Sequence, residues 1–454
     1  MTKQTALRIV ALFLLAFLVF SAAACGEKEP AESGGEDKEP ASFGWSKTLD
    51  LAQSDVHRGL APELTGDPAS LKIGVILIGD ESEGYTKAHI DGINNAAEKL
   101  GIAPGQIIWK SKVPENDDAV AAADQLYAEG CRLIISNSYG YQDYMLEAAR
   151  KHSDAQYIAM TGDLAAGVAA QGEIENYANA FTDVYQSRFV SGAVAGLKLN
   201  ELLADGALTK ENNPNNFDAD GNIKIGYVGA YNYAEVISGF TAVFLGIKSV
   251  VPNVTMEVYY TNSWFDFDAE KAAAENLIDR GCVIICQHAD SAGAPTAAEI
   301  ANNAGKTVYS VGYNVSMLSS AEHASLTSAT NVWEVYYEFA FATVINGDKL
   351  PTNWSGGYDV GAVAITELGA SCSPDTASYV KDLESKLKKG ELQVFDTSKF
   401  TYKGKTLTWA YATDTDGNFV YDANNVISDG YFHESYVQSA PAFNIIIDGI
   451  KELN

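Results

Sequence analysis

Basic residues are scarce in this 454-residue chain, which has 31 lysines and arginines against 59 aspartates and glutamates. The resulting net charge is −28 at pH 7. Proteins that bind nucleic acid depend on clusters of basic side chains to neutralise phosphates, so this balance argues against a nucleic-acid partner. We interpret the acidic surplus as a source of solubility.

Cysteine is also rare, with five in the whole chain. Apart from Cys25 they are Cys131, Cys282, Cys286 and Cys372, and no two of them form a CxxC motif. Cys282 and Cys286 lie in one apolar run. This distribution favours small buried side chains over a disulfide framework or a metal site.

Sequence signatures of common enzymes are missing. We find no GxSxG nucleophile elbow, P-loop, GxGxxG or HExxH motif, and His433-Glu434 has no second histidine at the required spacing. His288 has no other histidine near it in the sequence, so we interpret it as a structural residue. The sequence therefore predicts a protein that carries out no reaction and needs no cofactor or metal.

Apolar runs long enough to span a bilayer are absent after residue 25. Before it, two basic residues, the apolar run Ile9–Phe20 and four small residues are typical of a secretory signal peptide. Cys25 and the glycine after it resemble the lipobox of bacterial lipoproteins, although Ala22 stands where leucine is usual. We expect residues 1–24 to be removed and Cys25 to be diacylated, which gives a stable anchor. An ordinary cleaved signal that ends near Cys25 is the alternative.

Residues 25–48 are charged and rich in glycine, proline and serine. Such a composition cannot bury enough apolar surface to fold, so it predicts a disordered tether. A lipidated cysteine, a tether and a globular body together indicate an extracytoplasmic protein that is lipid-anchored to the bacterial cell membrane.

The stretch Lys72–Leu100 shows how the globular body is built. Ile73–Ile78 is a short apolar run typical of a strand buried on both faces, and polar turn residues follow it. Thr86–Leu100 then places its apolar residues on one helical face. This is half of a βαβ unit, so Asp80 and Tyr85, in the loop after the strand, are the first candidate site residues.

The chain contains a short internal repeat. Lys72-Ile73-Gly74 is echoed by Lys224-Ile225-Gly226, and Gly130-Cys131 by Gly281-Cys282. The two anchors are 58 residues apart in the first half and 57 in the second, and strands and helices alternate in the same order. This pattern predicts two α/β lobes with parallel sheets and right-handed crossovers.

The repeat suggests where the lobes begin and end. We expect lobe 1 over residues 49–182 and lobe 2 over residues 183–324. Residues 325–390 would return between the lobes as crossing segments and helices. Residues 391–454 would form a strand-rich C-terminal extension.

Polar and aromatic residues gather in the loops after the predicted strands. They are Asp80, Tyr85, Asn137, Tyr139 and Asp163 in lobe 1, and Trp264, Phe265, Asp266, His288, Asp290 and Asn314 in lobe 2. Aromatic faces can sandwich a flat ring while carboxylates and amides take its donors and acceptors. We therefore predict one site for a small polar ligand with a flat ring, enclosed between the lobes.

These residues also have structural interpretations that the sequence leaves open. Asp and Asn after a strand often cap the next helix, a role as common for Asp80, Asn137 and Asn314 as a ligand contact. Trp264 could pack against the helix that follows it.

Between Lys72 and Ile365 the chain contains, in this order, KIGVILIGD, GYTKAHIDGI, LIISNSYGYQ, SRFVSGAVAGL, KIGYVGAY, TNSWFD, VIICQHAD and SVGYNVSML. With the lipobox, these stretches resemble the Bmp family of basic membrane protein or purine nucleoside receptor A-like lipoproteins, which bind substrates for ABC importers. The resemblance implies a type I periplasmic-binding-protein fold. In that fold two Rossmann-like lobes with parallel sheets are joined by a three-crossing hinge, and the ligand lies in the cleft.

The resemblance assigns roles to single residues. Tyr85, in the loop that Asp80 opens, matches the first aromatic residue that stacks on the ligand. Trp264 matches the second, with its neighbour Phe265 as the alternative.

Polar residues are assigned in the same way. Asn137 matches a base-binding asparagine, and Asp163, or Thr161 beside it, matches a base-reading aspartate. The loop Ala289–Gly293, which contains Asp290, corresponds to a loop near the ribose. Asn314 and Asn331 stand where the family has the Asp and Lys of the sugar site, so the ring sandwich is better supported than a sugar clamp.

The sequence thus predicts a monomeric receptor that binds a purine-type nucleoside or nucleobase and works with the permease and ATPase subunits of an ABC importer. Two alternatives stay open. One is a surface lipoprotein that signals ligand occupancy to a membrane kinase or chemoreceptor. The other is a nucleoside hydrolase that acts through Asp80 or Asp163, because paired carboxylates need no sequence signature.

Overall fold

The computed structural model describes residues 56–454, except 171, 173, 418–419 and 422–424. These residues belong to one compact unit. The predicted signal peptide, the lipidation site Cys25 and the tether over residues 25–48 lie outside the described residues. No helix in the described part of the chain is long and apolar enough to cross a membrane.

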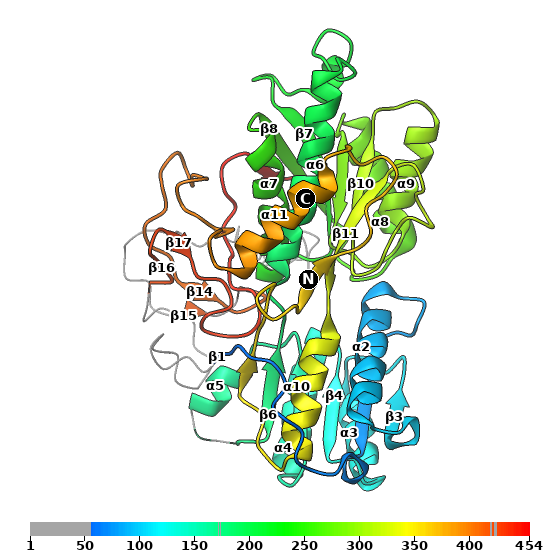
Figure 1. Cartoon of the computed structure of the whole chain (residues 1–454), viewed down its shortest axis with the longest axis vertical. Helices are drawn as coiled ribbons and strands as arrows, with labels where there is room; N and C mark the ends of the chain where they lie inside the picture. The colour runs from blue at the N-terminus through cyan, green and yellow to red at the C-terminus, as the bar shows by residue number, and fades with distance from the viewer. Residues whose placement is uncertain (1–55, 171, 173, 418–419, 422–424) are drawn as a thin grey trace, which may run out of the picture. The chain divides into compact units, whose positions relative to one another are not determined.

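Two sheets of seven strands each form the centres of two lobes (Figure 1). In lobe 1 the order is β1 (Val56–His57), β12 (Asn353–Trp354), β6 (Tyr177–Ala180), β5 (Gln156–Met160), β4 (Leu133–Ser136), β2 (Ile73–Ile76) and β3 (Ile107–Lys110). All neighbouring strands of this sheet pair in parallel. Every residue of β2 and β4 is buried, as their apolar runs predict.

The sheet of lobe 2 has the order β13 (Val363–Ile365), β11 (Ser325–Asn331), β10 (Tyr309–Tyr313), β9 (Ile284–Gln287), β7 (Ile223–Gly229), β8 (Val254–Tyr260) and β18 (Ile450–Glu452). Its pairs are parallel apart from β11 with β13, which is antiparallel. The order β3-β2-β4-β5 of lobe 1 recurs here as β8-β7-β9-β10. The predicted duplication and the predicted fold class are therefore confirmed.

Helices cover both sheets, as expected for parallel strands joined by crossovers. Those of lobe 1 are α2 (Gly84–Leu100), α3 (Asp117–Ala128), α4 (Gln142–Lys151), α5 (Ala165–Ala170) and α10 (Trp333–Ile345). Those of lobe 2 are α6 (Val184–Ala204), α7 (Ala234–Val250), α8 (Phe267–Asp279), α9 (Gly293–Asn303) and α11 (Thr376–Lys388). Short 3-10 turns are η2 (Pro68–Ser70), η3 (Pro104–Gln106), η4 (Tyr139–Tyr141) and η5 (Pro214–Asn216).

The glycine of the repeated Lys-Ile-Gly motif has the same packing role in both lobes. A Cβ on Gly74 would lie 2.9 Å from Cβ of Leu126 in α3, and a Cβ on Gly226 would lie 3.0 Å from Cβ of Leu277 in α8. The strand that carries the motif in each sheet, β2 or β7, therefore needs glycine so that the crossover helix can approach it. This explains why the motif occurs twice.

The chain passes between the two sheets after β6, after β11 and after β12, as the three-crossing hinge requires. The buried Asp183 joins the crossing after β6 to the crossing after β12, because its carboxylate accepts a hydrogen bond from Ser355 Oγ at 2.8 Å; it also accepts from Arg58 Nη1 at 2.5 Å. Thr182 Oγ1 donates to Asn331 Oδ1 at 2.5 Å. Asn331, which the resemblance placed near the sugar, is thus bound within the hinge.

Residues 391–454 are less regular than the predicted strand-rich extension. Their strands are the pairs β14 (Ala412–Thr413) with β15 (Val420–Tyr421) and β16 (Ile427–Ser428) with β17 (Tyr431–Phe432), together with β18. Most of the apolar residues of the segment are buried in the core of lobe 2 instead of alternating along strands, whereas Ala440 packs in the core of lobe 1. Phe395 and Phe443 stack there at 4.4 Å.

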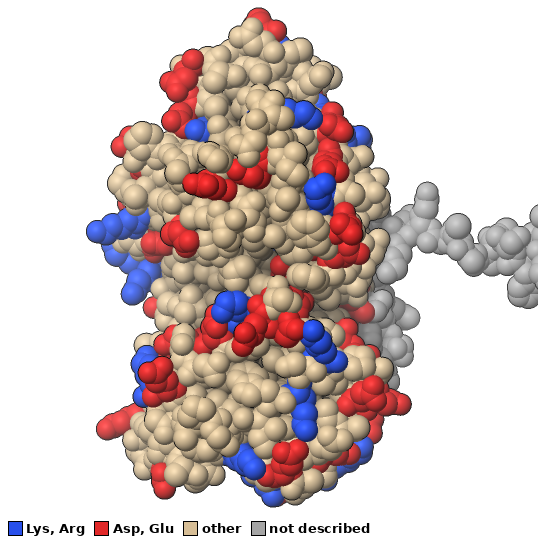
Figure 2. Space-filling view, turned by 90° about the vertical axis from the view of Figure 1, so that its right-hand side faces the viewer, with Lys and Arg blue, Asp and Glu red and all other residues tan. Residues whose placement is uncertain are grey.

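Carboxylates are spread over both lobes on the face shown in Figure 2, with lysines and arginines scattered among them. Of the cysteines, Cys131, Cys282 and Cys286 are buried and unpaired, and Cys372 is half-buried and unpaired. The prediction of small buried thiols is confirmed for the first three.

Gly74→Ala should destabilise the protein by about 1–3 kcal/mol, because the added methyl group overpacks the contact with Leu126. Urea denaturation measures this loss. The control Gly105→Ala adds a methyl group with no atom within 4 Å and should stay within about 0.5 kcal/mol of wild type. Equal stability of both variants would contradict the packing account.

Candidate functional site

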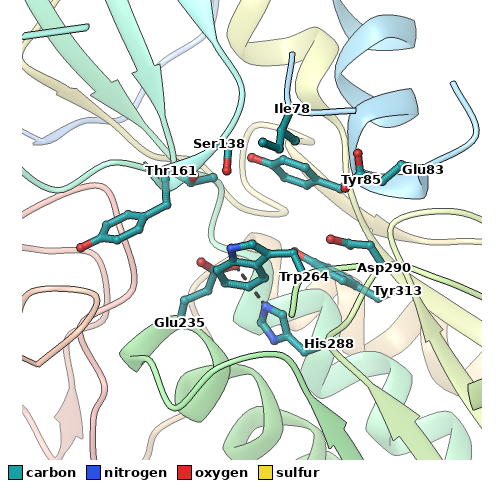
Figure 3. Close-up of a pocket in the computed structure, with 11 residues that line it drawn as sticks. Ile78, Glu83, Tyr85, Ser138, Thr161, Glu235, Trp264, His288, Asp290 and Tyr313 are labelled. Atoms are coloured by element: carbon teal, nitrogen blue, oxygen red, sulfur yellow. Dashed lines mark hydrogen bonds and ion pairs between the residues drawn. The ribbon is translucent and has the colours of Figure 1, made fainter. Parts of the chain in front are cut away.

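A cavity that is partly open to solvent lies between the lobes (Figure 3). Its lining comes from loops and helix starts that follow the carboxyl ends of strands in both sheets. The residues are Ile78, Glu83, Tyr85, Ser138, Tyr139 and Thr161 from lobe 1, and Glu235, Trp264, His288, Asp290 and Tyr313 from lobe 2. The cavity is therefore where ligands of open parallel sheets bind.

The two lobes touch at the rim of this cavity. A Cβ on Gly84, the first residue of α2 in lobe 1, would lie 3.1 Å from Val315 Cγ2 and 3.4 Å from the Asp290 carbonyl oxygen in lobe 2. The rings of Tyr139 and Tyr233 meet across the cleft with centroids 5.8 Å apart. The structure is therefore that of a closed cleft.

Tyr85 and Trp264 lie on opposite sides of the cavity (Figure 3). The Tyr85 hydroxyl donates to the carbonyl oxygen of Asn137, and its ring packs edge-on against His89 at 4.5 Å. His89 in turn stacks on Trp333 at 4.5 Å. These contacts fix the orientation of Tyr85 before any ligand arrives.

Trp264 belongs to a cluster of aromatic side chains in the loops of lobe 2. Its ring lies 5.1 Å from Tyr231 and 6.1 Å from Tyr233, and these two tyrosines stack at 5.2 Å. Trp264 is therefore held by aromatic neighbours while one side of it lines the cavity.

Carboxyl groups form the floor on the lobe 2 side. Glu235 Oε1 lies 3.0 Å from Nε2 of the buried His288, whose Nδ1 lies 3.3 Å from the Tyr227 hydroxyl. Burial raises the pKa of Glu235 to about 7 and lowers that of His288 well below its ordinary value. A carboxyl that titrates near neutral pH can donate or accept a hydrogen bond toward a ligand, whereas both ring nitrogens of His288 already have protein partners.

Asp290 occupies the other end of the lobe 2 lining. Asn314 Nδ2 donates to its Oδ1 at 2.6 Å, and Asn331 Nδ2 donates to Asn314 Oδ1 at 3.0 Å. Burial raises the pKa of Asp290 well above the usual aspartate value. Asn314 thus orients Asp290 from behind and does not line the cavity itself.

A buried arginine packs against one of the lining residues of lobe 2. The guanidinium of Arg188, in α6, lies 3.6 Å from the centroid of the Tyr313 ring, and its Nη1 donates to the Gln287 carbonyl at 2.5 Å. Its positive charge acts to lower the pKa of Glu235, but the effect of burial, which raises that pKa, is larger. Arg188 therefore balances part of the negative charge around the cavity.

Thr161 holds a strained backbone at the end of β5. Its φ is +61°, a value that β-branched residues rarely adopt. Its hydroxyl donates to the Met160 carbonyl at 2.6 Å. Such strain is found where the surrounding structure imposes a geometry needed at a site.

The structure places the predicted site residues in three groups. Tyr85, Trp264 and Asp290 line the cavity. Asn137 and Asn314 are buried directly behind it, and Asn137 also accepts from the Ile78 N–H at 2.9 Å.

The remaining three lie elsewhere. Asp80 pairs with Lys112 at 2.6 Å and accepts from the Ser82 N–H, which holds its pKa below the usual range, and it does not line the cavity. Phe265 is 43% exposed. Asp163 is buried, and its Oδ2 accepts from the Thr415 N–H at 2.7 Å.

Several lining residues were missed in the sequence, above all Glu83, Glu235 and Tyr313. A signal existed for Glu235, because it is the one acidic residue in the largely apolar helix α7 and lies in the first turn of that helix. In the described residues no group of three or more metal-ligating side chains is placed to hold a metal.

Comparison with known proteins gives a consistent result. The family model described as Bmp, ABC transporter substrate-binding protein PnrA-like, matches residues 72–398. That stretch contains all the residues that line the cavity.

The chain is 28% identical over 326 residues to a purine-binding protein of Brucella abortus, which covers 72% of this chain and 83% of that protein. It is 29% identical over 292 residues to a protein of Haloferax volcanii named as an ABC transporter glucose-binding protein, covering 63% and 66%. An ABC transporter solute-binding protein of Aeropyrum pernix K1 has a similar fold, with a TM-score of 0.56 at 16% identity over 72% of this chain and 93% of that one.

Glu235→Gln should flatten the pH dependence of stability. Because the folded pKa of about 7 lies above that of an unfolded glutamate, Glu235 destabilises the fold as pH rises from about 4.5 through 7. Between pH 5 and 8 the variant should gain roughly 1–3 kcal/mol of unfolding free energy relative to wild type. Urea denaturation at several pH values measures this, with the exposed Glu391→Gln as control. Parallel pH profiles for wild type and Glu235→Gln would show that the burial of Glu235 has no such effect.

Proposed function

Because the chain belongs to the Bmp family of PnrA-like ABC transporter substrate-binding proteins, we propose that it binds a purine-type nucleoside or nucleobase between its lobes. The observation that carries this proposal is the pair Tyr85 and Trp264, which come from opposite lobes and flank one cavity. A flat ring stacked between them would be held by both lobes at once. The purine-binding relative supports the same ligand class.

The polar lining suits the edge of a purine. Glu235, Asp290 and Thr161 offer hydrogen-bond acceptors around the aromatic slot, and a protonated Glu235 offers a donor. Closure over the ring removes water from these contacts, which strengthens them. The carboxylate of Asp290 can also accept from a sugar hydroxyl, so a nucleoside and a free base both remain within the proposal.

We propose further that the protein carries out no reaction. The two carboxylates considered for a hydrolase are engaged elsewhere, Asp80 with Lys112 and Asp163 with the Thr415 N–H, and neither lines the cavity. The proposed partners are the permease and ATPase subunits of an importer, with a monomeric receptor anchored to the extracytoplasmic membrane surface through Cys25. A pulldown that recovers a membrane kinase and no permease would favour a sensor instead.

Trp264→Ala and Tyr85→Ala should each weaken purine binding by about 10- to 100-fold, since base–aromatic stacking contributes about 1–3 kcal/mol per base. Isothermal titration calorimetry with inosine, adenosine, guanosine, adenine, hypoxanthine and glucose measures this. Phe265→Ala should bind like wild type, because its ring is exposed outside the cavity lining. Binding of glucose alone, or a larger loss in Phe265→Ala than in Trp264→Ala, would contradict the proposed stack.

A further inference from the structure

The C-terminal extension begins near the end of the family match and reaches the ligand cleft from the side. The match ends at residue 398, and the extension continues to residue 454. In Figure 1 its short strands β14 and β15 lie at the level between the two sheets. No residue of the extension is among those that line the cavity, so its contacts at the cleft are considered separately.

The extension is fixed to lobe 2. Its last strand, β18, pairs in parallel with β8, and Asn454 Oδ1 accepts from the Tyr260 N–H at 2.9 Å. Phe395, Phe400 and Phe443 are buried in the core of lobe 2. Near the hinge it also contacts lobe 1, because the Ser439 N–H donates to Oδ1 of Asn353 in β12 at 3.1 Å.

One residue of the extension bonds to both lobes. The N–H of the buried Thr415 donates to Oδ2 of Asp163 in lobe 1 at 2.7 Å. Its carbonyl oxygen accepts from the N–H of Ala234, the first residue of α7 in lobe 2, also at 2.7 Å. Ala234 precedes Glu235 and Asp163 follows Thr161 by two residues, so the bridge lies directly beside the cavity lining.

The neighbouring residues support this placement. Burial, together with the fields of Asp163, Asp416 and Asp414, raises the pKa of Tyr139 above its ordinary value. Tyr139 lines the cavity from lobe 1, so two carboxylates of the extension lie within electrostatic range of the site. Gln438 Nε2 donates to the Thr413 carbonyl at 3.1 Å, which holds the segment from its other side.

We infer that Thr415 is a positioning residue of the ligand cleft, whose backbone holds Asp163 of lobe 1 against lobe 2 and keeps the lobes closed. Because the last strand and the buried phenylalanines of the extension belong to lobe 2, we expect opening about the hinge to break the bond from Thr415 to Asp163. Segment 413–416 thereby lies next to residues that line the site, without lining it itself. This inference deepens the proposed function, on which the identity of the ligand rests.

The test measures the separation of the lobes in the ligand-free, full mature chain. Nitroxide labels at the exposed positions Asp118 in α3 and Asp268 in α8 report the distance by double electron–electron resonance. Thr415→Pro removes the N–H donor and keeps the carbonyl. Thr406→Pro makes the same change at an exposed threonine of the extension and serves as the matched control.

A second pair of variants probes the bond from lobe 1, in case Thr415→Pro does not fold. Asp163→Ala removes the acceptor, whereas Asp163→Asn retains an oxygen that can accept from the same N–H. We expect Thr415→Pro and Asp163→Ala to raise the ratio of open to closed molecules by about tenfold. Thr406→Pro and Asp163→Asn should keep the wild-type distance distribution.

Unchanged distances in Asp163→Ala, or an equal shift in Thr406→Pro and Thr415→Pro, would overturn the inference. A shift in Asp163→Asn as large as in Asp163→Ala would also overturn it, because the acceptor oxygen would then not matter. Since no ligand is present, these outcomes are separate from the ligand assignment. A protein that opens as expected and binds no purine would refute only the proposed function.

Discussion

The geometry of the parallel sheet is the constraint on which the rest of the structure depends. Parallel strands end at one edge, so the loops that follow them converge there. The two sheets share a strand order, and the carboxyl-terminal edges of their strands face each other. All eleven residues that line the cavity follow strand ends or lie at them. In each lobe a crossover helix packs closely against its sheet, and this close packing requires Gly74 in lobe 1 and Gly226 in lobe 2.

Closure of the cleft buries several carboxyl groups around one cavity, and their burial is unfavourable without a ligand that donates hydrogen bonds to them. Glu83, Glu235 and Asp290 are buried at the lining of one cavity, and burial raises the pKa of each. Arg188 stacks under Tyr313 and supplies positive charge nearby. A donor-rich flat ring between aromatic faces would satisfy these acceptors, which is why the lining favours a purine-type ligand.

Much of the fold follows from local sequence. The repeated Lys-Ile-Gly motif and the alternation of strands and helices predicted two parallel lobes, and Tyr85, Trp264 and Asp290 were predicted from their positions after strands. Asp80 follows a strand too, yet it pairs with Lys112, because loop direction depends on neighbours distant in the sequence. The contact between Asp163 and Thr415 joins residues 252 positions apart, and no local pattern could reveal it.

The central claim is that a purine ring lies between the two lobes, and a thermal-shift screen of the mature domain tests it most directly. Nucleosides, free bases, glucose and amino acids would each be added at millimolar concentration. A ligand of micromolar affinity should stabilise the folded state by about 4 kcal/mol and raise the melting temperature accordingly. The account predicts a shift with purine nucleosides or bases alone, whereas a shift only with glucose or amino acids would contradict it.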